Sequence, residues 1–301
     1  MNVNPHQAQS YTKRLSQVLD HLDFASIDAA VSADPEDANS GTQTQTESDE
    51  TNSLPATSPW QSFPKGADYG SLLHDLLEWQ AQQGWPLALA NTDTPDFTQQ
   101  AWQQFITRKT RTLQLPPRAT AMLPKWINGV ITTPLPLATQ AANTKPLVLH
   151  QLTPENQWPE MEFTITADAV NSEFIDKLIQ QHVLPELARP PLQARVLQGM
   201  LTGFMDLVCE HEKQFWVLDY KSNWLSSYEP AQLNAAVLDK RYDVQYVLYL
   251  LALHRLLSSR LENYDYNLHV GGAIYVFLRG IHTEGAGVHC IKPPLTLIKQ
   301  L

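Results

Sequence analysis

Two short apolar segments around a polar turn form the most informative pattern in this chain. Residues 204–209 and 215–218 are predominantly apolar, and the five residues between them, 210–214, are mostly polar or charged. Two β-compatible segments separated by a short polar stretch are typical of a β-hairpin. We therefore predict two antiparallel strands here, near residues 201–208 and 214–221.

Charged side chains lie within the arms of this predicted hairpin. Asp206 interrupts the first arm, while Asp219, Tyr220 and Lys221 follow one another at the end of the second. Because side chains alternate between the two faces of a strand, Asp219 and Lys221 are expected on one face and Tyr220 on the other. The hairpin thus offers two carboxylates and an ammonium group to a common point. A salt-bridged strand end is the simplest interpretation of an isolated Asp-x-Lys, since such pairs are common.

The remaining hydrophobic pattern predicts a mixture of helices and strands. Met161, Phe163 and Ile165 alternate with polar residues, which indicates a half-buried strand. The nearly continuous apolar run 271–278 suits a strand that is buried on both faces. Helical spacing is found at 70–79, 97–113, 171–183 and 231–259, with a short helix at best near 119–131. Together these elements predict an α/β fold with a mixed central β-sheet flanked by helices.

The first part of the chain has a different composition from the rest. Residues 30–62 are rich in polar and acidic side chains, and such a stretch buries too little apolar surface to offset its ordering entropy. We therefore expect a mostly disordered acidic tail over residues 1–62, with an optional short helix near 16–24, and a globular domain over 63–301. Of the net charge of −10, −7 falls in the first sixty residues. The nearly neutral remainder neither excludes nor favours nucleic acid as a ligand.

Several classes of protein are disfavoured by simple absences in the sequence. No run of about 18 apolar residues predicts a membrane span, and the first residues lack the apolar region of a secretory signal. Cys209 and Cys290 are too few for a disulfide framework. No G-x-x-x-x-G-K-[ST] motif is found, so the chain carries no P-loop motor of its own. A cytoplasmic protein is the expectation.

Other polar residues occur at spacings that place them on common helix faces. His74 and Glu78 are four residues apart in the helix predicted at 70–79, and Gln245 and Tyr249 are four apart in the long later helix. A histidine in a helix is more often a surface residue than a ligand. The hairpin carboxylates, in contrast, are hard oxygen ligands of the kind that Mg²⁺ or Mn²⁺ prefers.

Four motifs in a fixed order resemble those of a known family. They are Gly70-x-x-x-His74-x-x-x-Glu78, Gly203-Phe-Met-Asp206, Asp219-Tyr-Lys221-Ser-Asn223 and Gln245-x-x-x-Tyr249. This order resembles the PD-(D/E)XK nuclease superfamily and, more closely, the C-terminal nuclease domains of the RecB (beta) subunits of exodeoxyribonuclease V. The resemblance covers roughly residues 60–285.

The resemblance implies a metal-dependent deoxyribonuclease. It implies Mg²⁺, with Mn²⁺ as a possible substitute, hydrolysis of DNA phosphodiesters in double-strand-break repair and recombination, and helicase subunits as partners. Lys221 would be the catalytic lysine beside Asp206 and Asp219, while Glu162 is interpreted as a structural strand residue. The implied metal ligands are His74, Asp206, Asp219 and the carbonyl of Tyr220, and the supporting residues are Gln245, Tyr249 and Glu78.

Two other classes of function stay open at this stage. The first is a catalytically inactive nuclease fold that serves as an assembly or DNA-binding module; such a module would be expected to have lost at least one of the four key side chains, His74, Asp206, Asp219 or Lys221. The second is a metal-dependent hydrolase of small phosphate esters. The full subunits of the family carry a helicase motor ahead of this domain, so the sequence leaves open whether the chain is a fragment or acts alone.

Overall fold

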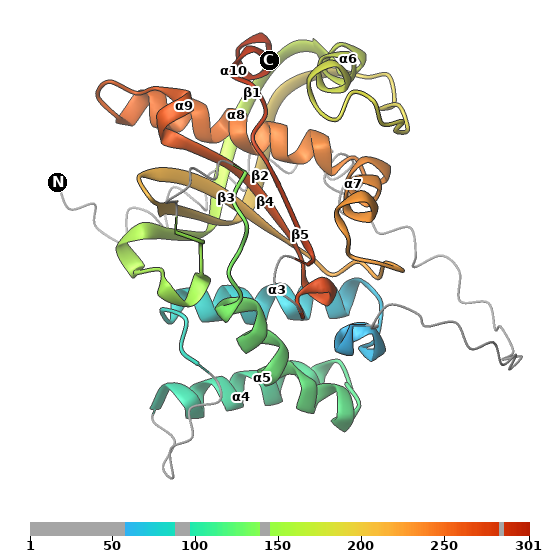
Figure 1. Ribbon diagram of the computed structural model, residues 1–301, viewed down its shortest axis with the longest axis vertical. Coiled ribbons are helices and arrows are strands. Elements are labelled where there is room, and N and C mark those ends of the chain that lie inside the picture. Colours follow the sequence, from blue (N-terminus) through green and yellow to red (C-terminus); the bar gives the residue numbers. More distant parts are fainter. Residues whose placement is uncertain (1–57, 88–96, 139–144, 283–285) are drawn as a thin grey trace, which may run out of the picture. The chain divides into compact units, whose positions relative to one another are not determined.

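A mixed β-sheet forms the centre of the computed structural model, which describes residues 58–87, 97–138, 145–282 and 286–301 (Figure 1). These residues all belong to one compact unit, Asp34–Leu301. Within them the sheet has five strands, of which β3 and β4 run parallel and all other neighbours antiparallel. In spatial order the strands are β1 (Gln157–Asn171), β2 (Val196–His211), β3 (Gln214–Lys221), β4 (Val270–Phe277) and β5 (Val288–Ile291). The predicted α/β fold with a mixed sheet is confirmed.

The predicted hairpin is formed by β2 and β3. His211 pairs with Gln214, so the connection has only two residues, Glu212 and Lys213. Both lie in the left-handed region, with φ of 50° and 64°. This is the backbone of a type I′ turn, whose twist matches that of the strands it joins. The short turn fixes the register that brings the second arm of the hairpin alongside Asp206.

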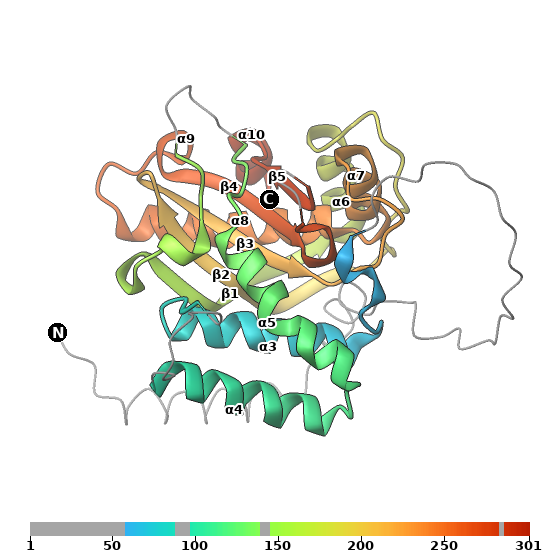
Figure 2. The same ribbon diagram turned by 60° about the horizontal axis from the view of Figure 1, so that its bottom comes forward.

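One face of the sheet is covered by three helices, α3 (Ala67–Gln82), α4 (Phe97–Thr112) and α5 (Pro117–Thr132) (Figure 2). Their buried side chains form one hydrophobic core with alternate residues of the central strands, among them Leu218 of β3 and Ile274 of β4. The predictions of helices near 70–79 and 97–113 are confirmed. As Figure 2 shows, α4 lies outside α3, and α3 separates it from the sheet.

The short helix predicted near 119–131 is instead a full helix of 16 residues that contains Pro124. Pro117 at its first turn has no N–H to leave unpaired and a fixed φ suited to a helix start. Burial of Leu123, Trp126 and Ile127 against the core offsets the hydrogen bond that Pro124 removes. The expectation was wrong because it weighed the prolines and not the apolar face between them.

The folded part begins before the predicted boundary at residue 63. Pro59–Ser62 forms the 3₁₀ helix η2, and Trp60 stacks on Trp126 with ring centroids 5.5 Å apart. The indole N–H of Trp60 also donates to the carbonyl of Ile281 (2.8 Å). Residues 58–62 therefore belong to the core and not to the tail. The rest of the predicted tail, including the optional helix near 16–24, lies outside the described residues.

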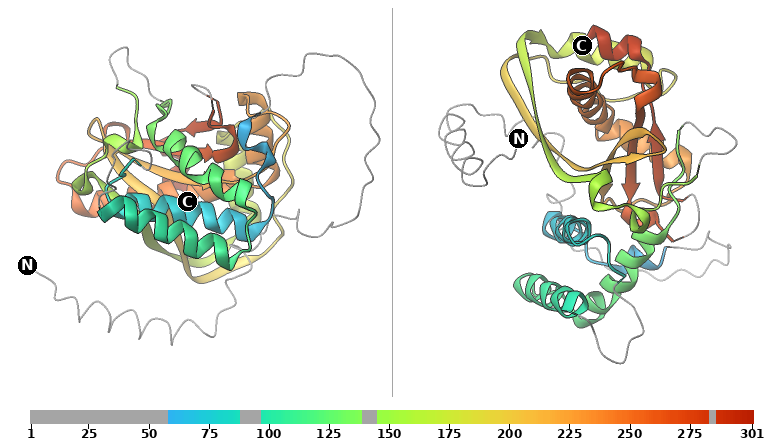
Figure 3. Two further views of the ribbon diagram at one scale, coloured as in Figure 1. Left: turned by 90° about the horizontal axis from the view of Figure 1, so that it is seen from below. Right: turned by 90° about the vertical axis from the view of Figure 1, so that its left-hand side faces the viewer.

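The opposite face of the sheet packs against α8 (Tyr242–Arg260), with Tyr246 and Tyr275 of β4 in edge-to-face contact. In the right-hand view of Figure 3 the β1–β2 ribbon curves around α8, and the rings of Phe163 and Tyr249 meet there. Beyond this ribbon lies α6 (Ser172–His182), as predicted. The remaining short elements are η3 (Leu149–Gln151), η4 (Pro154–Asn156), α9 (Tyr266–His269), η5 (Leu278–Gly280) and α10 (Leu295–Gln300).

The single long helix predicted over 231–259 is in fact two helices, α7 (Pro230–Asp239) and α8. Arg241 breaks them, because its backbone is left-handed (φ 54°) and its side chain is buried. The guanidinium donates to Asp243 (3.0 Å) and Asp176 (2.6 Å). This buried ion network holds the chain in a conformation that helical periodicity cannot reveal.

No described helix is long and apolar enough to cross a membrane.

Candidate active site

Asp206 lies where β2 and β3 begin to separate. The last regular pair of this ladder is Leu207 with Leu218. One residue further, Oδ2 of Asp206 accepts a hydrogen bond from the backbone N–H of Tyr220 (2.7 Å). A side chain thus satisfies a strand amide next to the end of the ladder. This contact fixes the Asp206 carboxylate beside the second arm of the hairpin.

His74 reaches Asp206 from the helix layer. Its Nδ1 is 3.3 Å from Oδ2 of Asp206, and its ring faces that of Tyr220 edge-on at 6.1 Å. Gly70, one turn earlier on α3, permits this approach, because a Cβ there would lie 2.8 Å from the hydroxyl of Ser222. The absence of a side chain lets α3 pack closely on the loop that follows β3. Gly70 therefore helps to bring His74 to the hairpin.

Lys221 is held from two sides. Its Nζ lies 2.7 Å from Oδ2 of Asp219 and donates to Oε1 of Gln245 on α8 (3.0 Å). Gln245 in turn donates to the hydroxyl of Tyr249 (2.9 Å) and accepts from that of Tyr275 (2.8 Å). The predicted alternation is confirmed, since Asp219 and Lys221 share one face of β3. The side chain of Tyr220 points to the other face, into the helix-covered core.

The charges of this cluster perturb one another strongly. Although desolvation opposes the charged form, the Asp206 carboxylate raises the pKa of the His74 imidazole to about 9. Desolvation would raise the pKa of Asp206, but the His74 charge and the Tyr220 N–H hold it below its ordinary value. The two groups therefore form an ion pair at neutral pH, at a place where the His74 side chain is 35% exposed.

Asp219 and Lys221 are more deeply buried. Desolvation, reinforced by the neighbouring charge of Asp206, raises the pKa of Asp219 to about 6. Desolvation would lower the pKa of Lys221, yet the Asp219 carboxylate raises it above its ordinary value. Lys221 is accordingly an ammonium ion at neutral pH. Two coupled carboxylates in one buried place are characteristic of sites that bind a cation or carry out acid–base chemistry.

Glu160 is a site residue that the sequence did not reveal. Partial desolvation, with the charges of Asp206 and Glu78, raises the pKa of its carboxyl to about 7. Its backbone is left-handed (φ 49°), although the register of β1 with β2 is the same on both sides of it, with Pro159 opposite Leu207 and Met161 opposite Met205. Glu162, two residues on, is exposed and lies opposite Phe204, the position expected of a structural strand residue. The only signal in the sequence was an extra acidic residue just before the alternating segment.

Glu78, predicted as a supporting residue, lies one turn after His74 on α3. It accepts a hydrogen bond from Gln82 (2.7 Å) and contributes its charge to the surroundings of Glu160. The structure thus brings His74, Asp206, Asp219, Lys221 and Gln245 together in one cluster and places Glu78 and Tyr249 at its edges. The roles of these residues stay predictions.

The cluster has the donors that a hard divalent cation prefers, but they do not yet converge. Among the described residues, no three His, Cys, Asp or Glu side chains surround a common point closely enough to hold a metal ion. Oδ2 of Asp219 is buried and has an ion-pair contact with Lys221 but no hydrogen bond. A buried carboxylate oxygen with spare lone pairs, beside a second carboxylate and an imidazole, fits a cation ligand set. The chemistry of the donors present therefore suits a hard divalent cation.

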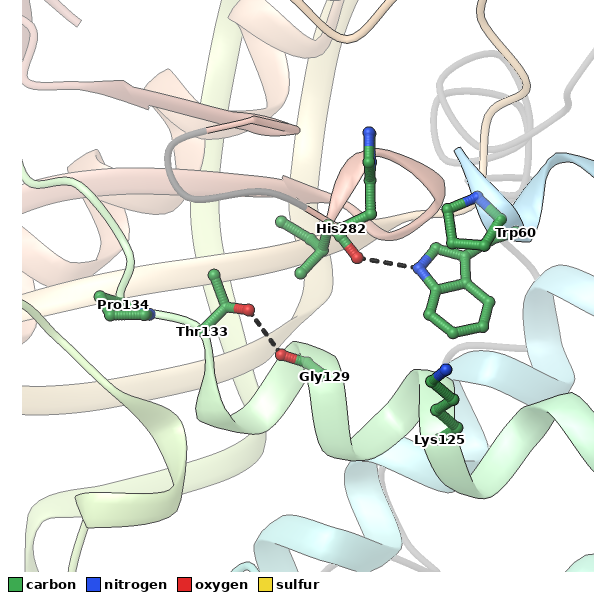
Figure 4. A pocket seen from close by; sticks show the side chains of 8 residues that line it. Trp60, Lys125, Gly129, Thr133, Pro134 and His282 are labelled. Carbon is green, nitrogen blue, oxygen red and sulfur yellow. Dashed lines mark hydrogen bonds between the residues drawn. The ribbon is translucent and has the colours of Figure 1, made fainter. Parts of the chain in front are cut away.

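Two cavities of the described residues lie away from this cluster. One of about 430 Å³ is formed between η2, α5 and the segment after η5, and is lined by Trp60, Lys125, Thr133 and His282 among others (Figure 4). The site residues described above take no part in it. In the cluster at the hairpin, the side chain of His74 is more exposed than that of Asp206.

The arrangement of an acidic hairpin, a following lysine and flanking helices is that of a nuclease core. The sequence profile of the PD-(D/E)XK nuclease superfamily matches residues 53–294. The chain belongs to this superfamily.

Within this superfamily, the chain is similar to several RecB subunits of the RecBCD enzyme. The chain is 37% identical over 251 residues to the RecBCD enzyme subunit RecB of Escherichia coli K12, which covers 81% of this chain and 19% of the relative. It is 30% identical over 246 residues to the RecBCD enzyme subunit RecB of Buchnera aphidicola subsp. Acyrthosiphon pisum, and this match covers 79% of the chain and 19% of the relative. It is 28% identical over 279 residues to the RecBCD enzyme subunit RecB of Mycolicibacterium smegmatis, and this match covers 81% of the chain and 24% of the relative. The chain spans about a fifth of the length of these relatives.

Proposed function

We propose that the chain is a metal-dependent deoxyribonuclease that hydrolyses DNA phosphodiesters. The observation that carries this proposal is the meeting of Asp206, Asp219 and Lys221 at the β2–β3 hairpin of a PD-(D/E)XK chain. Two carboxylates and a buried ammonium ion suit a reaction in which negative charge develops on a phosphate. None of the expected key side chains has been lost, which speaks against the inactive-module alternative.

The metal in this proposal is Mg²⁺, with Mn²⁺ as a substitute. His74, Asp206, Asp219 and the carbonyl of Tyr220 would hold it. When bound, such an ion supplies charge neutralisation at the scissile phosphate and a more acidic bound water. The buried Oδ2 of Asp219, paired with the Lys221 ammonium group, and the neighbouring carboxylate of Asp206 support this assignment.

Lys221 has a different role from the carboxylates. Its ammonium group is paired with Asp219 and its pKa is raised, so we assign it to stabilisation of the charge that develops on the phosphate oxygens. Gln245 holds the ammonium group from the side of α8, and Tyr249 and Tyr275 fix the orientation of that amide. An oriented cation stabilises a transition state at no reorganisation cost during the reaction.

The partners in this proposal follow from the named relatives. The similar proteins are subunits of the RecBCD enzyme, so we infer that this chain works in a multi-subunit complex in recombination and double-strand-break repair. Helicase subunits are the partners that the sequence resemblance implies.

The test is a substrate panel with controlled metal. Purified protein is incubated with linear duplex DNA, single-stranded DNA and several small phosphate monoesters and diesters, each with Mg²⁺, Mn²⁺ or chelator. We expect the protein to cleave DNA and to leave the small phosphate esters intact. We expect this cleavage only when metal is added. Turnover of the small esters in preference to DNA would replace the proposal with the phosphate-ester hydrolase. Metal-dependent DNA binding without any cleavage would instead support the inactive module.

A further inference from the structure

The α4–α5 segment has a charge composition unlike that of the rest of the chain. Residues 97–138 contain five cationic side chains and no aspartate or glutamate, in a chain whose net charge is −10. The five are Arg108, Lys109, Arg111, Arg118 and Lys125. All 31 acidic residues of the chain lie outside this segment, so it is a distinctly basic part of the described structure.

Three of these cations form an exposed group around the turn between the two helices. Arg108 and Arg111 are three residues apart near the end of α4 and therefore share one face of it, while Arg118 follows in the first turn of α5. All three are exposed. We call these three residues the α4–α5 basic face. Among the described residues, no ion pair joins any of them to a carboxylate.

Local helix electrostatics explain only part of this arrangement. Arg108 and Arg111 lie near the C-terminal end of α4, where a cation is favoured by the helix dipole. Arg118, however, stands at the N-terminal end of α5, where the dipole disfavours positive charge. Like charges at a spacing of three or four residues also repel. The helix dipole thus does not account for Arg118 or for the repulsion within the group, and a polyanion bound from outside would offset both.

The basic face lies beside the helix turn that carries His74. Lys109, between Arg108 and Arg111 on α4, forms an ion pair with Asp75, the residue that follows His74 on α3. The end of α4 is therefore anchored to the turn of α3 that carries His74. A groove of about 560 Å³ runs along this part of α4 and is lined by Gln104, Thr107, Arg108, Arg111 and Thr112.

We propose that the α4–α5 basic face binds the phosphate backbone of the DNA strand that enters the site. The proposal rests on the proposed function in that the polyanion is DNA. The hairpin itself is a poor place for the flanking phosphates, because the carboxylates of Glu78 and Glu160 lie near those of Asp206 and Asp219. Repulsion there and attraction at Arg108, Arg111 and Arg118 would draw the strand across α3, with one phosphate beside His74.

The experiment separates binding from cleavage. The variants are Arg108→Gln with Arg111→Gln, and Arg118→Gln. The matched control is Arg255→Gln with Arg260→Gln, which removes two equally exposed cations from α8. Dissociation constants for a labelled single-stranded oligonucleotide and a blunt duplex are measured in chelator over a series of salt concentrations. KM and kcat for cleavage are measured with Mg²⁺, and melting curves confirm the fold.

We expect the Arg108/Arg111 double variant to bind DNA about tenfold more weakly at low salt, and its log–log salt slope to fall in magnitude by roughly 0.7 per lost contact on single strands. Its kcat at saturating DNA should stay within about twofold, with the loss confined to KM. Arg118→Gln should show a smaller change of the same kind, and the α8 control almost none.

Equal affinities and salt slopes for wild type, the Arg108/Arg111 variant and the α8 control would overturn the proposal and point to another partner for this face. A loss of kcat without a change in binding would overturn it as well. Because binding is measured in chelator, the outcome does not depend on catalysis. A wild type that binds through this face but never cleaves would refute the proposed function alone.

Discussion

The β2–β3 hairpin and the α4–α5 segment hold their charges in opposite ways. At the hairpin, Asp219 and Lys221 are buried, paired and fixed by neighbouring side chains. On the α4–α5 segment, Arg108, Arg111 and Arg118 are exposed and have no acidic partner in the part of the chain that the structure describes. Burying a charge costs desolvation free energy, so a buried and oriented charge points to a role in chemistry or specificity. Exposed positive charge, in contrast, attracts a polyanion. This difference suits the hairpin to a reaction and the α4–α5 segment to binding.

This comparison predicts that hairpin substitutions change the rate of cleavage and leave DNA affinity unchanged. The largest effect is expected at Asp206. Asp206→Ala removes a proposed metal ligand and also leaves the Tyr220 N–H without its acceptor. Cleavage should fall by roughly 10³-fold or more, and the free energy of unfolding by about 1–3 kcal/mol.

Asp206→Asn is the matched variant for this position. Its amide oxygen can still accept from the Tyr220 N–H, so stability should recover while cleavage does not. Single-turnover cleavage and urea unfolding of both variants provide the measurement. Recovery of activity together with stability in Asp206→Asn would mean that the carboxylate is structural.

His74 should show the next largest effect. His74→Ala removes an imidazole from the proposed ligand set but leaves both carboxylates in place. The Mg²⁺ concentration for half-maximal cleavage should rise about tenfold or more, whereas the melting temperature should change little because the side chain is partly exposed. His282→Ala, an exposed histidine at the separate cavity, is the control. An unchanged metal requirement would exclude His74 from the ligand set.

Lys221→Gln should lower kcat by roughly 10²-fold, which is typical for the loss of one charge-stabilising group. An ammonium ion does not bind metal, so the affinity for Mg²⁺ should be nearly unchanged, and DNA affinity in chelator should match that of wild type. Isothermal titration with Mg²⁺ and single-turnover kinetics together test this. A variant that loses metal binding along with activity would show that Lys221 acts by holding the carboxylates in place.

The smallest effect concerns the stability of the sheet at low pH. Burial lowers the pKa of His289 to about 4, and its Nε2 has no hydrogen-bond partner. Between pH 6.5 and 4 the unfolded chain binds a proton that the folded chain does not, so the free energy of unfolding decreases as pH falls through this window. The full loss is up to roughly 3 kcal/mol. Urea midpoints at pH 7 and 4.5 should differ less for His289→Gln than for wild type; an equal difference would contradict this.

The sequence predicted the hairpin and β4 because their hydrophobic patterns are short, regular and bounded by polar turns. It also predicted the meeting of Asp206, Asp219 and Lys221, since side-chain alternation within a hairpin leaves little freedom, whereas the two-residue turn, shorter than the polar stretch 210–214, is a finding of the structure. His74 and Gln245 were assigned through the resemblance of their motifs, because no local pattern relates a residue on one helix to a strand far along the chain.

The features that the sequence did not predict depend on tertiary contacts. The left-handed backbone of Glu160 has no counterpart in the alternating pattern of the sequence. Arg241 interrupts a continuous helical pattern because of ion pairs with Asp176 and Asp243. The proximity of the α4–α5 basic face to His74 became apparent only when the ion pair of Lys109 and Asp75 placed α4 on α3.

The central claim is that the hairpin carboxylates form a metal-dependent site for phosphodiester hydrolysis. Its most direct test compares wild type with Asp219→Ala on linear duplex and single-stranded DNA in the presence of Mg²⁺, with binding measured separately in chelator. We predict that wild type alone cleaves, that chelator abolishes this cleavage, and that the two proteins bind DNA equally well. Equal cleavage by wild type and Asp219→Ala would contradict the assignment of the site.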